Sequence, residues 1–130
     1  MPSNSSWKGA ISLEYRYTAG VAGERFLNGL KAGRLLAAHC DRCGVTYLPP
    51  RMYCERCLSG LKRWSEVDRK GYLYSYTVTH PGRRPVVVGL AKFKGIEGGI
   101  LAPISVAKKK LRIGTAVKIS IKGGKVSLSL

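Results

Sequence analysis

The sequence predicts a mostly β protein in which one helix and a small cysteine ribbon precede a five-stranded barrel. Two Cys-x-x-Cys pairs near the middle of the chain indicate the ribbon. Alternating apolar and polar residues occupy most of the last 60 residues, and this period of two is typical of half-buried strands. A single stretch ahead of the cysteines has helical spacing instead. At 130 residues, the chain has room for one domain or for two very small ones.

Residues 1–33 are predicted to form an N-terminal arm and a helix. The arm is polar at first, and over residues 11–17 apolar side chains alternate with polar ones, which indicates an extended segment. Within residues 22–32, three apolar residues share one helical face: Phe26, Leu27 and Leu30. Gly33 lies where a helix C-cap is expected, and Gly29 weakens the helix, so the helix needs packing support.

Residues 34–70 are predicted to form a zinc ribbon. The cysteines form two Cys-x-x-Cys pairs separated by ten residues: Cys40, Cys43, Cys54 and Cys57. Four thiolates at this spacing can surround one tetrahedral Zn²⁺ ion and leave no open position for water, so we expect a structural zinc site. Iron in a rubredoxin-like site suits the same geometry, and two disulfides or a redox-active pair are further alternatives. His39 is expected to be partly exposed and not a ligand, because the thiols already satisfy the metal.

Residues 71–130 are predicted to form an OB-fold barrel. The apolar or alternating runs are residues 72–79, 86–93, 100–106, 117–122 and 126–130. Turn signals separate these runs, and Gly123-Gly124 is a two-residue hairpin turn. Five short strands suit a small closed barrel, for which the OB-fold is the natural candidate, although periodicity alone does not distinguish it from other small barrels. The glycine-rich residues 95–99 are expected to turn a hairpin.

The chain is strongly basic. Lys and Arg total 23 against seven Asp and Glu, a formal net charge of +16, and residues 71–130 hold 11 basic residues and one acid, hence +10. Such a surface attracts nucleic acids, acidic proteins or phosphate-bearing ligands, although the charge could also serve solubility alone. No apolar run approaches the roughly 18 residues of a membrane span, and residues 1–7 do not resemble a secretory signal, so a cytoplasmic location without membrane attachment is expected.

The sequence contains no recognisable catalytic constellation. The nearest carboxylate pair, Glu66 and Asp68, is flanked by Arg63, Arg69 and Lys70, and a solvated ionic patch explains it more simply than general acid–base catalysis. The chain has neither a G-x-S-x-G elbow nor a glycine-rich phosphate loop that joins a strand to a helix. We therefore expect no catalytic residue and no enzymatic activity.

Three features could bind a ligand. Arg51 follows two prolines, so a stiff segment presents its guanidinium to a phosphate or to a partner's carboxylate, unless the prolines merely shape the ribbon loop. Tyrosines at positions 72, 74 and 76 could stack with bases, although we favour an aromatic face that packs inward against the ribbon. A basic cluster near the C-terminus suits an anion and consists of Lys108, Lys109, Lys110 and Arg112.

Together these motifs resemble a family of small archaeal and bacterial proteins that join a rubredoxin-like zinc ribbon to an OB-fold. The resemblance rests on the helix–glycine–strand lead-in, Cys43-Gly44, Pro49-Pro50-Arg51 and residues 71–78. Glu55 departs from the family, whose members commonly have proline there, and this difference should not disturb metal ligation. The resemblance implies partners of the thiolase and hydroxymethylglutaryl-CoA synthase type and an association with acyl-CoA.

The favoured hypothesis is a non-catalytic accessory or scaffold subunit that binds a thiolase or hydroxymethylglutaryl-CoA synthase and helps to bind or channel acyl-CoA. The ribbon and the N-terminal helix would dock on the partner, and basic residues would hold the phosphates of coenzyme A. The alternative is a basic zinc-ribbon and OB-fold protein that binds nucleic acid. An acyl-transfer enzyme is a third hypothesis, which the lack of a nucleophile–base pair disfavours.

Overall fold

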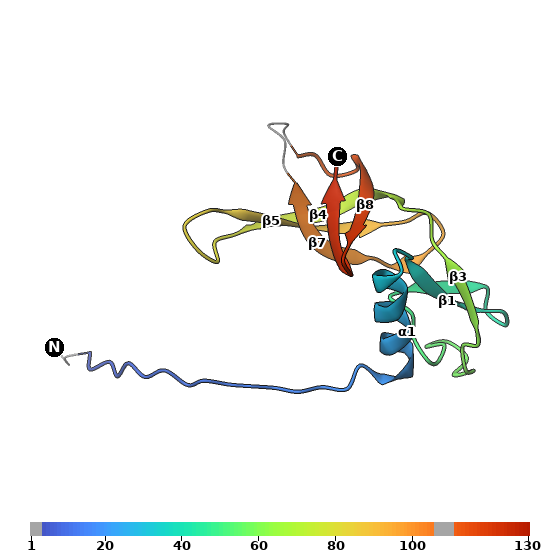
Figure 1. Ribbon diagram of the computed structural model, residues 1–130, viewed down its shortest axis with the longest axis horizontal. Coiled ribbons are helices and arrows are strands. Elements are labelled where there is room, and N and C mark those ends of the chain that lie inside the picture. The colour runs from blue at the N-terminus through green and yellow to red at the C-terminus, as the bar shows by residue number, and fades with distance from the viewer. Residues whose placement is uncertain (1–3, 106–110) are drawn as a thin grey trace.

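The computed structural model describes residues 4–105 and 111–130, which form one helix and nine strands (Figure 1). In chain order these elements are α1 (Gly20–Lys31), β1 (Leu36–Cys40), β2 (Val45–Leu48), β3 (Arg63–Glu66), β4 (Lys70–Thr79), β5 (Val86–Lys92), β6 (Glu97–Gly98), β7 (Ile100–Ser105), β8 (Ala116–Lys122) and β9 (Lys125–Ser129). Over these residues, no helix is both long and apolar enough to cross a membrane.

The strands form two sheets. One is a four-stranded sheet in the order β3-β1-β2-β6, and the other is a closed barrel in the order β4-β5-β7-β9-β8. Neighbouring barrel strands are antiparallel except β7 and β9, which are parallel. In Figure 1 the barrel lies above the ribbon sheet, and α1 stands beside β1. The predicted fold class, a mostly β chain with a helix, a ribbon and a five-stranded barrel, is confirmed.

Residues 95–99 do more than turn a hairpin, because two of them form strand β6, which belongs to the ribbon sheet. β6 runs parallel to β2, with Leu48 opposite Gly98, and the Gly99 N–H donates to the Leu48 carbonyl at 2.9 Å. Gly98 has a φ of +94°, and a side chain there would collide with the Leu48 carbonyl. Only glycine allows this approach. The C-terminal half of the chain therefore supplies the last strand of the ribbon sheet.

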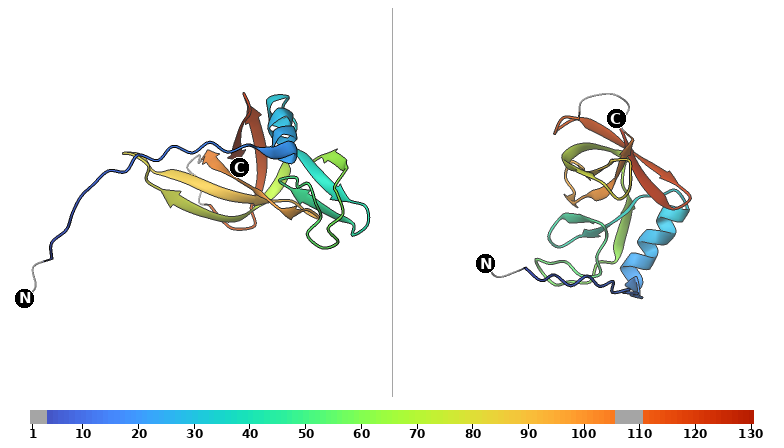
Figure 2. Two further views of the ribbon diagram at one scale, coloured as in Figure 1. Left: turned by 90° about the horizontal axis from the view of Figure 1, so that it is seen from below. Right: turned by 90° about the vertical axis from the view of Figure 1, so that its left-hand side faces the viewer.

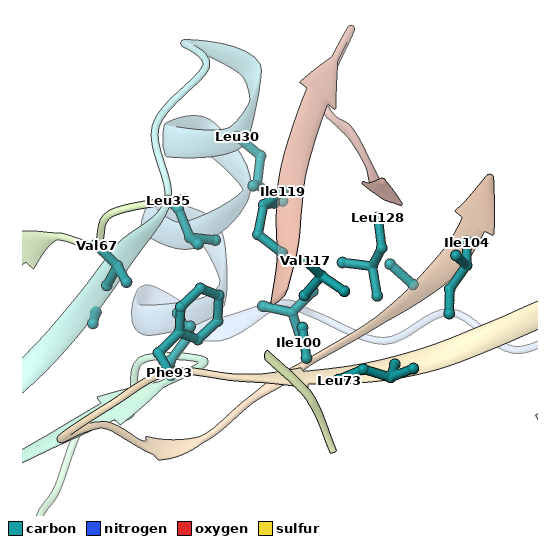
Figure 3. Packing of buried hydrophobic residues seen from close by; sticks show 14 residues of the cluster. Leu30, Leu35, Val67, Leu73, Phe93, Ile100, Ile104, Val117, Ile119 and Leu128 are labelled. Carbon is teal, nitrogen blue, oxygen red and sulfur yellow. The ribbon is translucent and has the colours of Figure 1, made fainter. Parts of the chain in front are cut away.

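One hydrophobic core joins the barrel, the helix and the base of the ribbon. Figure 3 shows its larger members: Leu30, Leu35, Val67, Leu73, Phe93, Ile100, Ile104, Val117, Ile119 and Leu128. Each such side chain contributes about 1.5–3 kcal/mol when it is fully buried. A second, smaller cluster surrounds the cysteines and includes Ala38, Tyr47 and Leu61. The cysteine end of the ribbon thus has a small core of its own.

Helix α1 contacts both sheets. It packs against β1 and β9, as its weak intrinsic helix propensity requires. A Cβ on Gly29 would lie 2.8 Å from Leu36 Cδ1, so the glycine that weakens the helix also allows its close approach to β1. The Arg25 guanidinium lies 5.2 Å from the centroid of the Trp64 ring on β3. The helix therefore contacts the ribbon through β1 and the barrel through β9.

Residues 4–19 form an extended arm outside the body of the protein. All of them are exposed, and none belongs to a helix or strand. Figure 1 shows the arm running away from the start of α1, and the right-hand view in Figure 2 shows it apart from both sheets. The expected arm is therefore present, and the alternating pattern of residues 11–17 has no partner within the described part of the chain.

A bulge interrupts the pairing of β4 with β5. Leu73 lies opposite Ala91, whereas Ser75 lies opposite Leu90, so Tyr74 is an extra residue in β4. Before the bulge, Leu73 and Ala91 are both fully buried and face the core. The insertion of one residue changes which face the later side chains of β4 occupy.

The bulge separates the three tyrosines. Tyr72 lies opposite Lys92 on the outer face of the barrel, and the Lys92 ammonium lies 4.1 Å from the centroid of the Tyr74 ring, so Tyr74 is on the outer face as well. Tyr76 lies opposite Gly89, which faces the core because a side chain there would collide with core residues. The three tyrosines are 39%, 50% and 40% exposed in chain order. The expectation of one aromatic face packed inward against the ribbon is therefore wrong.

Candidate metal centre

The first cysteine pair lies in the turn between β1 and β2. Cys40 ends β1, and its carbonyl accepts a hydrogen bond from the Gly44 N–H at 2.8 Å. The Cys43 N–H points at Cys40 Sγ, with 3.4 Å between nitrogen and sulfur. Gly44 has a φ of +69°, which a residue without Cβ adopts at little cost. This tight turn brings the two sulfur atoms to one side of the loop.

The second pair repeats the geometry of the first. The Leu58 N–H donates to the Cys54 carbonyl at 2.9 Å, as Gly44 does to Cys40. Leu58 also has a left-handed backbone, with a φ of +59°. A further bond from the Cys54 N–H to the Ser59 carbonyl, 2.9 Å long, closes the loop. Two similar knuckles thus face each other.

The structure brings the four predicted ligands together. Their sulfur atoms all lie within 4.8 Å of one another, and Cys40 Sγ lies 3.6 Å from Cys57 Sγ. A tetrahedron with Zn–S bonds of about 2.3 Å has sulfur–sulfur edges of about 3.8 Å, so this cluster fits one tetrahedral ion. The four cysteines are free thiols and form no disulfide. The ribbon can therefore hold a structural zinc ion, as the sequence predicted.

Hydrogen bonds to neighbours set the proton affinity of the thiols. A hydrogen bond with the Tyr47 hydroxyl, 3.3 Å away, lowers the pKa of Cys54 to about 6. A hydrogen bond with Ser59 lowers the pKa of Cys57. A hydrogen bond with Cys57 raises the pKa of Cys43 to about 12, because four crowded thiols retain a proton when no cation balances them. Zinc binding requires thiolates, so metal uptake must release protons.

Tyr47 is a functional residue that the sequence did not identify. Its side chain is 1% exposed, and the hydrogen bond with Cys54 raises its pKa to about 12, so the phenol stays protonated and can donate to the thiolate. Such donors orient metal ligands and stabilise their negative charge. The only signal in the sequence was that Tyr47 is one of two tyrosines between the cysteine pairs, and a tyrosine there is equally typical of a core residue.

The remaining sequence candidates near the cysteines have other partners. His39 Nδ1 lies 2.8 Å from Thr46 Oγ1, and His39 is not part of the sulfur cluster. The Arg51 guanidinium lies 2.5 Å from the Glu55 carboxylate and 4.9 Å from the centroid of the Tyr47 ring. Arg51 thus forms an ion pair with a residue of the second knuckle, and its side chain is half exposed. A role for Arg51 in ligand binding stays a prediction.

The C-terminal basic cluster lies mostly outside the described residues. These undescribed residues are Lys108, Lys109 and Lys110. Arg112 is described and exposed, and its carbonyl accepts a hydrogen bond from the Thr115 N–H. The carboxylates of Glu66 and Asp68 line a shallow depression that also contains Lys70. A solvated ionic patch at this position agrees with the sequence analysis.

Comparisons with known proteins agree with this geometry. Residues 27–62 match the family model described as the ChsH2 rubredoxin-like zinc ribbon domain, and residues 64–122 match that of the ChsH2 C-terminal OB-fold domain. A solved protein of unknown function from the DUF35 family of Sulfolobus solfataricus is 31% identical, with a TM-score of 0.72 over 85% of this chain and 86% of that chain.

A second similar structure is described as the Ltp2-ChsH2(DUF35) aldolase. It is 24% identical, with a TM-score of 0.69 over 88% of this chain and 98% of that chain, and it shows likeness of fold. None of the curated proteins compared with the chain matches it.

Proposed function

This chain belongs to the DUF35 family of zinc-ribbon and OB-fold proteins, and we propose that it is a non-catalytic accessory subunit of an acyl-CoA enzyme. In this proposal it binds a thiolase or a hydroxymethylglutaryl-CoA synthase and helps to bind or channel acyl-CoA. The observation that carries the proposal is the combination of a four-thiol metal centre with an arm whose large apolar side chains are exposed.

The chemistry of the described residues favours a role without catalysis. The cysteine cluster is the one group in residues 4–105 and 111–130 that could hold a metal, and four thiolate ligands leave no position for a substrate or a water molecule. Apart from the Tyr47 phenol and the thiols of Cys40 and Cys54, no polar or charged side chain of these residues is buried. Catalytic acids and bases usually depend on such desolvation for their shifted pKa values. Here the shifted pKa values belong to the cysteine cluster and to Tyr47.

The arm and the outer face of α1 provide a surface for a partner protein. Large apolar side chains alternate along the arm and continue onto the helix: Trp7, Ile11, Leu13, Tyr15, Tyr17, Val21 and Leu27, which are 47–88% exposed. A contiguous exposed apolar set of this kind is typical of a protein–protein interface. The description of the structurally similar Ltp2-ChsH2(DUF35) aldolase, which names two proteins, supports an enzyme as the partner.

The basic surface supports an association with coenzyme A. The formal charge of +16 favours the three phosphate groups of this cofactor. Arg51 and the basic cluster that ends at Arg112 are candidates for phosphate contacts. The same charge would also attract nucleic acid, which is the competing function, and the exposed tyrosines on β4 add a possible stacking surface for bases.

Copurification of the natively expressed protein tests the proposal. We expect a thiolase or a hydroxymethylglutaryl-CoA synthase to copurify, and we expect the isolated chain to catalyse no acyl transfer. Leu13→Asp should abolish copurification, because it places a charge in the apolar row of the arm. Ser12→Asp is the matched control, since it adds the same charge to the opposite side of an extended segment.

Two outcomes would contradict the proposal. The first is acyl-transfer activity of the pure chain that a point mutation in this chain abolishes. The second is purification with nucleic acid and no acyl-CoA enzyme, with sequence-selective binding that persists at physiological salt, because nonspecific binding of single strands weakens steeply as salt rises.

A further inference from the structure

The outer surface of the barrel is aliphatic where its second and third strands, β5 and β7, lie side by side. In the register of these strands, Val88 lies opposite Pro103, and Leu90 lies opposite Leu101. Ala102, between Leu101 and Pro103, is buried in the core, so the residues on either side of it point outward, as do their partners on β5. Leu101 is 71% exposed. We call these four outward residues the β5–β7 face.

The hairpin that joins β4 to β5 places basic residues at one end of this face. Figure 1 shows the hairpin projecting from the barrel on the side away from the ribbon. Residues 75–82 and 85–91 include no Lys, Arg, Asp or Glu, whereas Arg83 and Arg84 lie at the exposed tip. Residues 69–96 contain no acid at all. An uncharged surface is therefore bordered by positive charge that no nearby carboxylate in the sequence balances.

A depression adjoins the β5–β7 face where the hairpin leaves the barrel. The residues that line it are all apolar: Pro85, Val86, Val87 and Ile104. An apolar side chain of a bound partner can become buried there, and burial of apolar surface is the main favourable contribution to most protein–protein association. The depression and the face together offer a continuous apolar contact surface.

The chemistry of this surface suits protein better than nucleic acid. In OB-folds the second and third strands and the loop between the first two are a usual binding surface for oligonucleotides. Sequence-tolerant binding of single strands depends on aromatic side chains that stack with the bases. Neither β5 nor β7 contains an aromatic residue, and on neighbouring β4 the Lys92 ammonium already covers the Tyr74 ring, 4.1 Å from its centroid. Aliphatic side chains instead match the apolar side chains of a protein.

We propose that this surface binds an acidic segment of another protein. Apolar side chains of that segment cover the β5–β7 face, and its carboxylates pair with Arg83 and Arg84. Arginine pairs with carboxylates through two parallel hydrogen bonds, and a formal charge of +16 attracts acidic partners over a distance. The same charge disfavours a second copy of this chain, because two such surfaces repel each other. The surface does not include the arm, so it is a second docking site and does not depend on the proposed function.

Selection of peptides from a phage-displayed random library on the zinc-loaded full chain tests the proposal. We expect the enriched peptides to combine Leu, Ile or Val with adjacent Asp or Glu. Leu101→Ser should weaken the binding of such a peptide about tenfold, because one leucine side chain no longer becomes buried on binding. The matched control is Leu58→Ser, which changes a leucine that is 76% exposed on the second knuckle and should have no effect.

A second pair of variants tests the charge. Replacement of both Arg83 and Arg84 with Ser should weaken the binding of the same peptide about fivefold, the effect expected for the loss of two exposed ion pairs. Replacement of both Lys8 and Arg16 with Ser removes the same charge from the arm and should leave the affinity unchanged.

Three outcomes of these measurements would each overturn the proposal: enrichment of no acidic peptide, unchanged binding by Leu101→Ser, or equal losses for the two charge variants. Oligothymidylate that displaces the peptide at physiological salt, and whose binding Leu101→Ser weakens, would assign the face to nucleic acid and also overturn it. Leu13→Asp, the variant that tests docking through the arm, should leave peptide binding intact. Failure of this proposal and failure of the proposed function are therefore distinguishable.

Discussion

Leu58 takes the position in the second knuckle that Gly44 takes in the first. Their φ angles are +59° and +69°. A residue with a Cβ pays about 1–2 kcal/mol for a left-handed backbone, whereas glycine adopts it readily. Leu58 is 76% exposed, so burial of its side chain does not offset this cost within the chain. The knuckle therefore holds Leu58 in a strained conformation.

The variant Leu58→Gly should raise the free energy of unfolding by about 0.5–1 kcal/mol, because relief of the strain exceeds the extra chain entropy of glycine. Gly44→Ala is the reciprocal control and should lower the free energy of unfolding by about 1 kcal/mol. A Cβ on Gly44 would meet nothing within 4 Å. The change in the free energy of unfolding therefore measures only the cost of the left-handed backbone. Urea unfolding of the zinc-loaded variants measures both. Destabilisation by Leu58→Gly would show that the leucine side chain contributes packing.

Individual residues differ in how far the sequence predicted their roles. The spacing of the cysteines predicted their convergence, because a Cys-x-x-Cys turn brings its two sulfurs together whatever surrounds it. The contact of Tyr47 with Cys54 depends instead on how β2 and the second knuckle meet in space. Arg51 is engaged by Glu55, the residue at which this chain departs from the family pattern it resembles.

At the level of elements, alternation predicted the strands but not their registers. Residues 72–78 keep a period of two in the sequence, so the tyrosines were assigned to a single face. The bulge at Tyr74 belongs to the pairing of β4 with β5 and leaves no mark on that pattern. In the same way, the sequence pattern did not predict β6. This strand forms through the pairing of Gly98 with Leu48, two residues that are far apart in the sequence.

The arm should be dispensable for folding. Deletion of residues 1–17 should change the free energy of unfolding by no more than about 0.5 kcal/mol, because surface changes without packing contacts have effects of this size. Trypsin should cut the intact protein first at Lys8 and Arg16, which are exposed in the extended arm. Leu30→Ala in the buried face of α1, by contrast, should cost about 2–5 kcal/mol. Loss of more than 1 kcal/mol on arm deletion would show that the arm packs on the body in solution.

For the whole molecule, the main consequence of the structure is that ribbon, helix and barrel share one core. Leu35 and Val67 from the ribbon side pack with Phe93 and Ile119 from the barrel side. The division of the chain at residues 33 and 70 stays a prediction about domains, because this core crosses both positions. The cysteine end of the ribbon, by contrast, depends on its own small cluster and on the metal.

The decisive experiment on the metal centre is to remove the metal while following backbone amide signals by NMR, with elemental analysis of the starting protein. We expect one zinc ion per chain. Stripping the metal should collapse the signals of the two knuckles and of β2, while the barrel strands, which lie on the larger core, keep theirs. The reason is that metal binding in such a site is itself folding free energy, on the order of 10 kcal/mol. A metal-free chain in which the knuckle signals stay dispersed and the thermal midpoint is unchanged would contradict a structural zinc site.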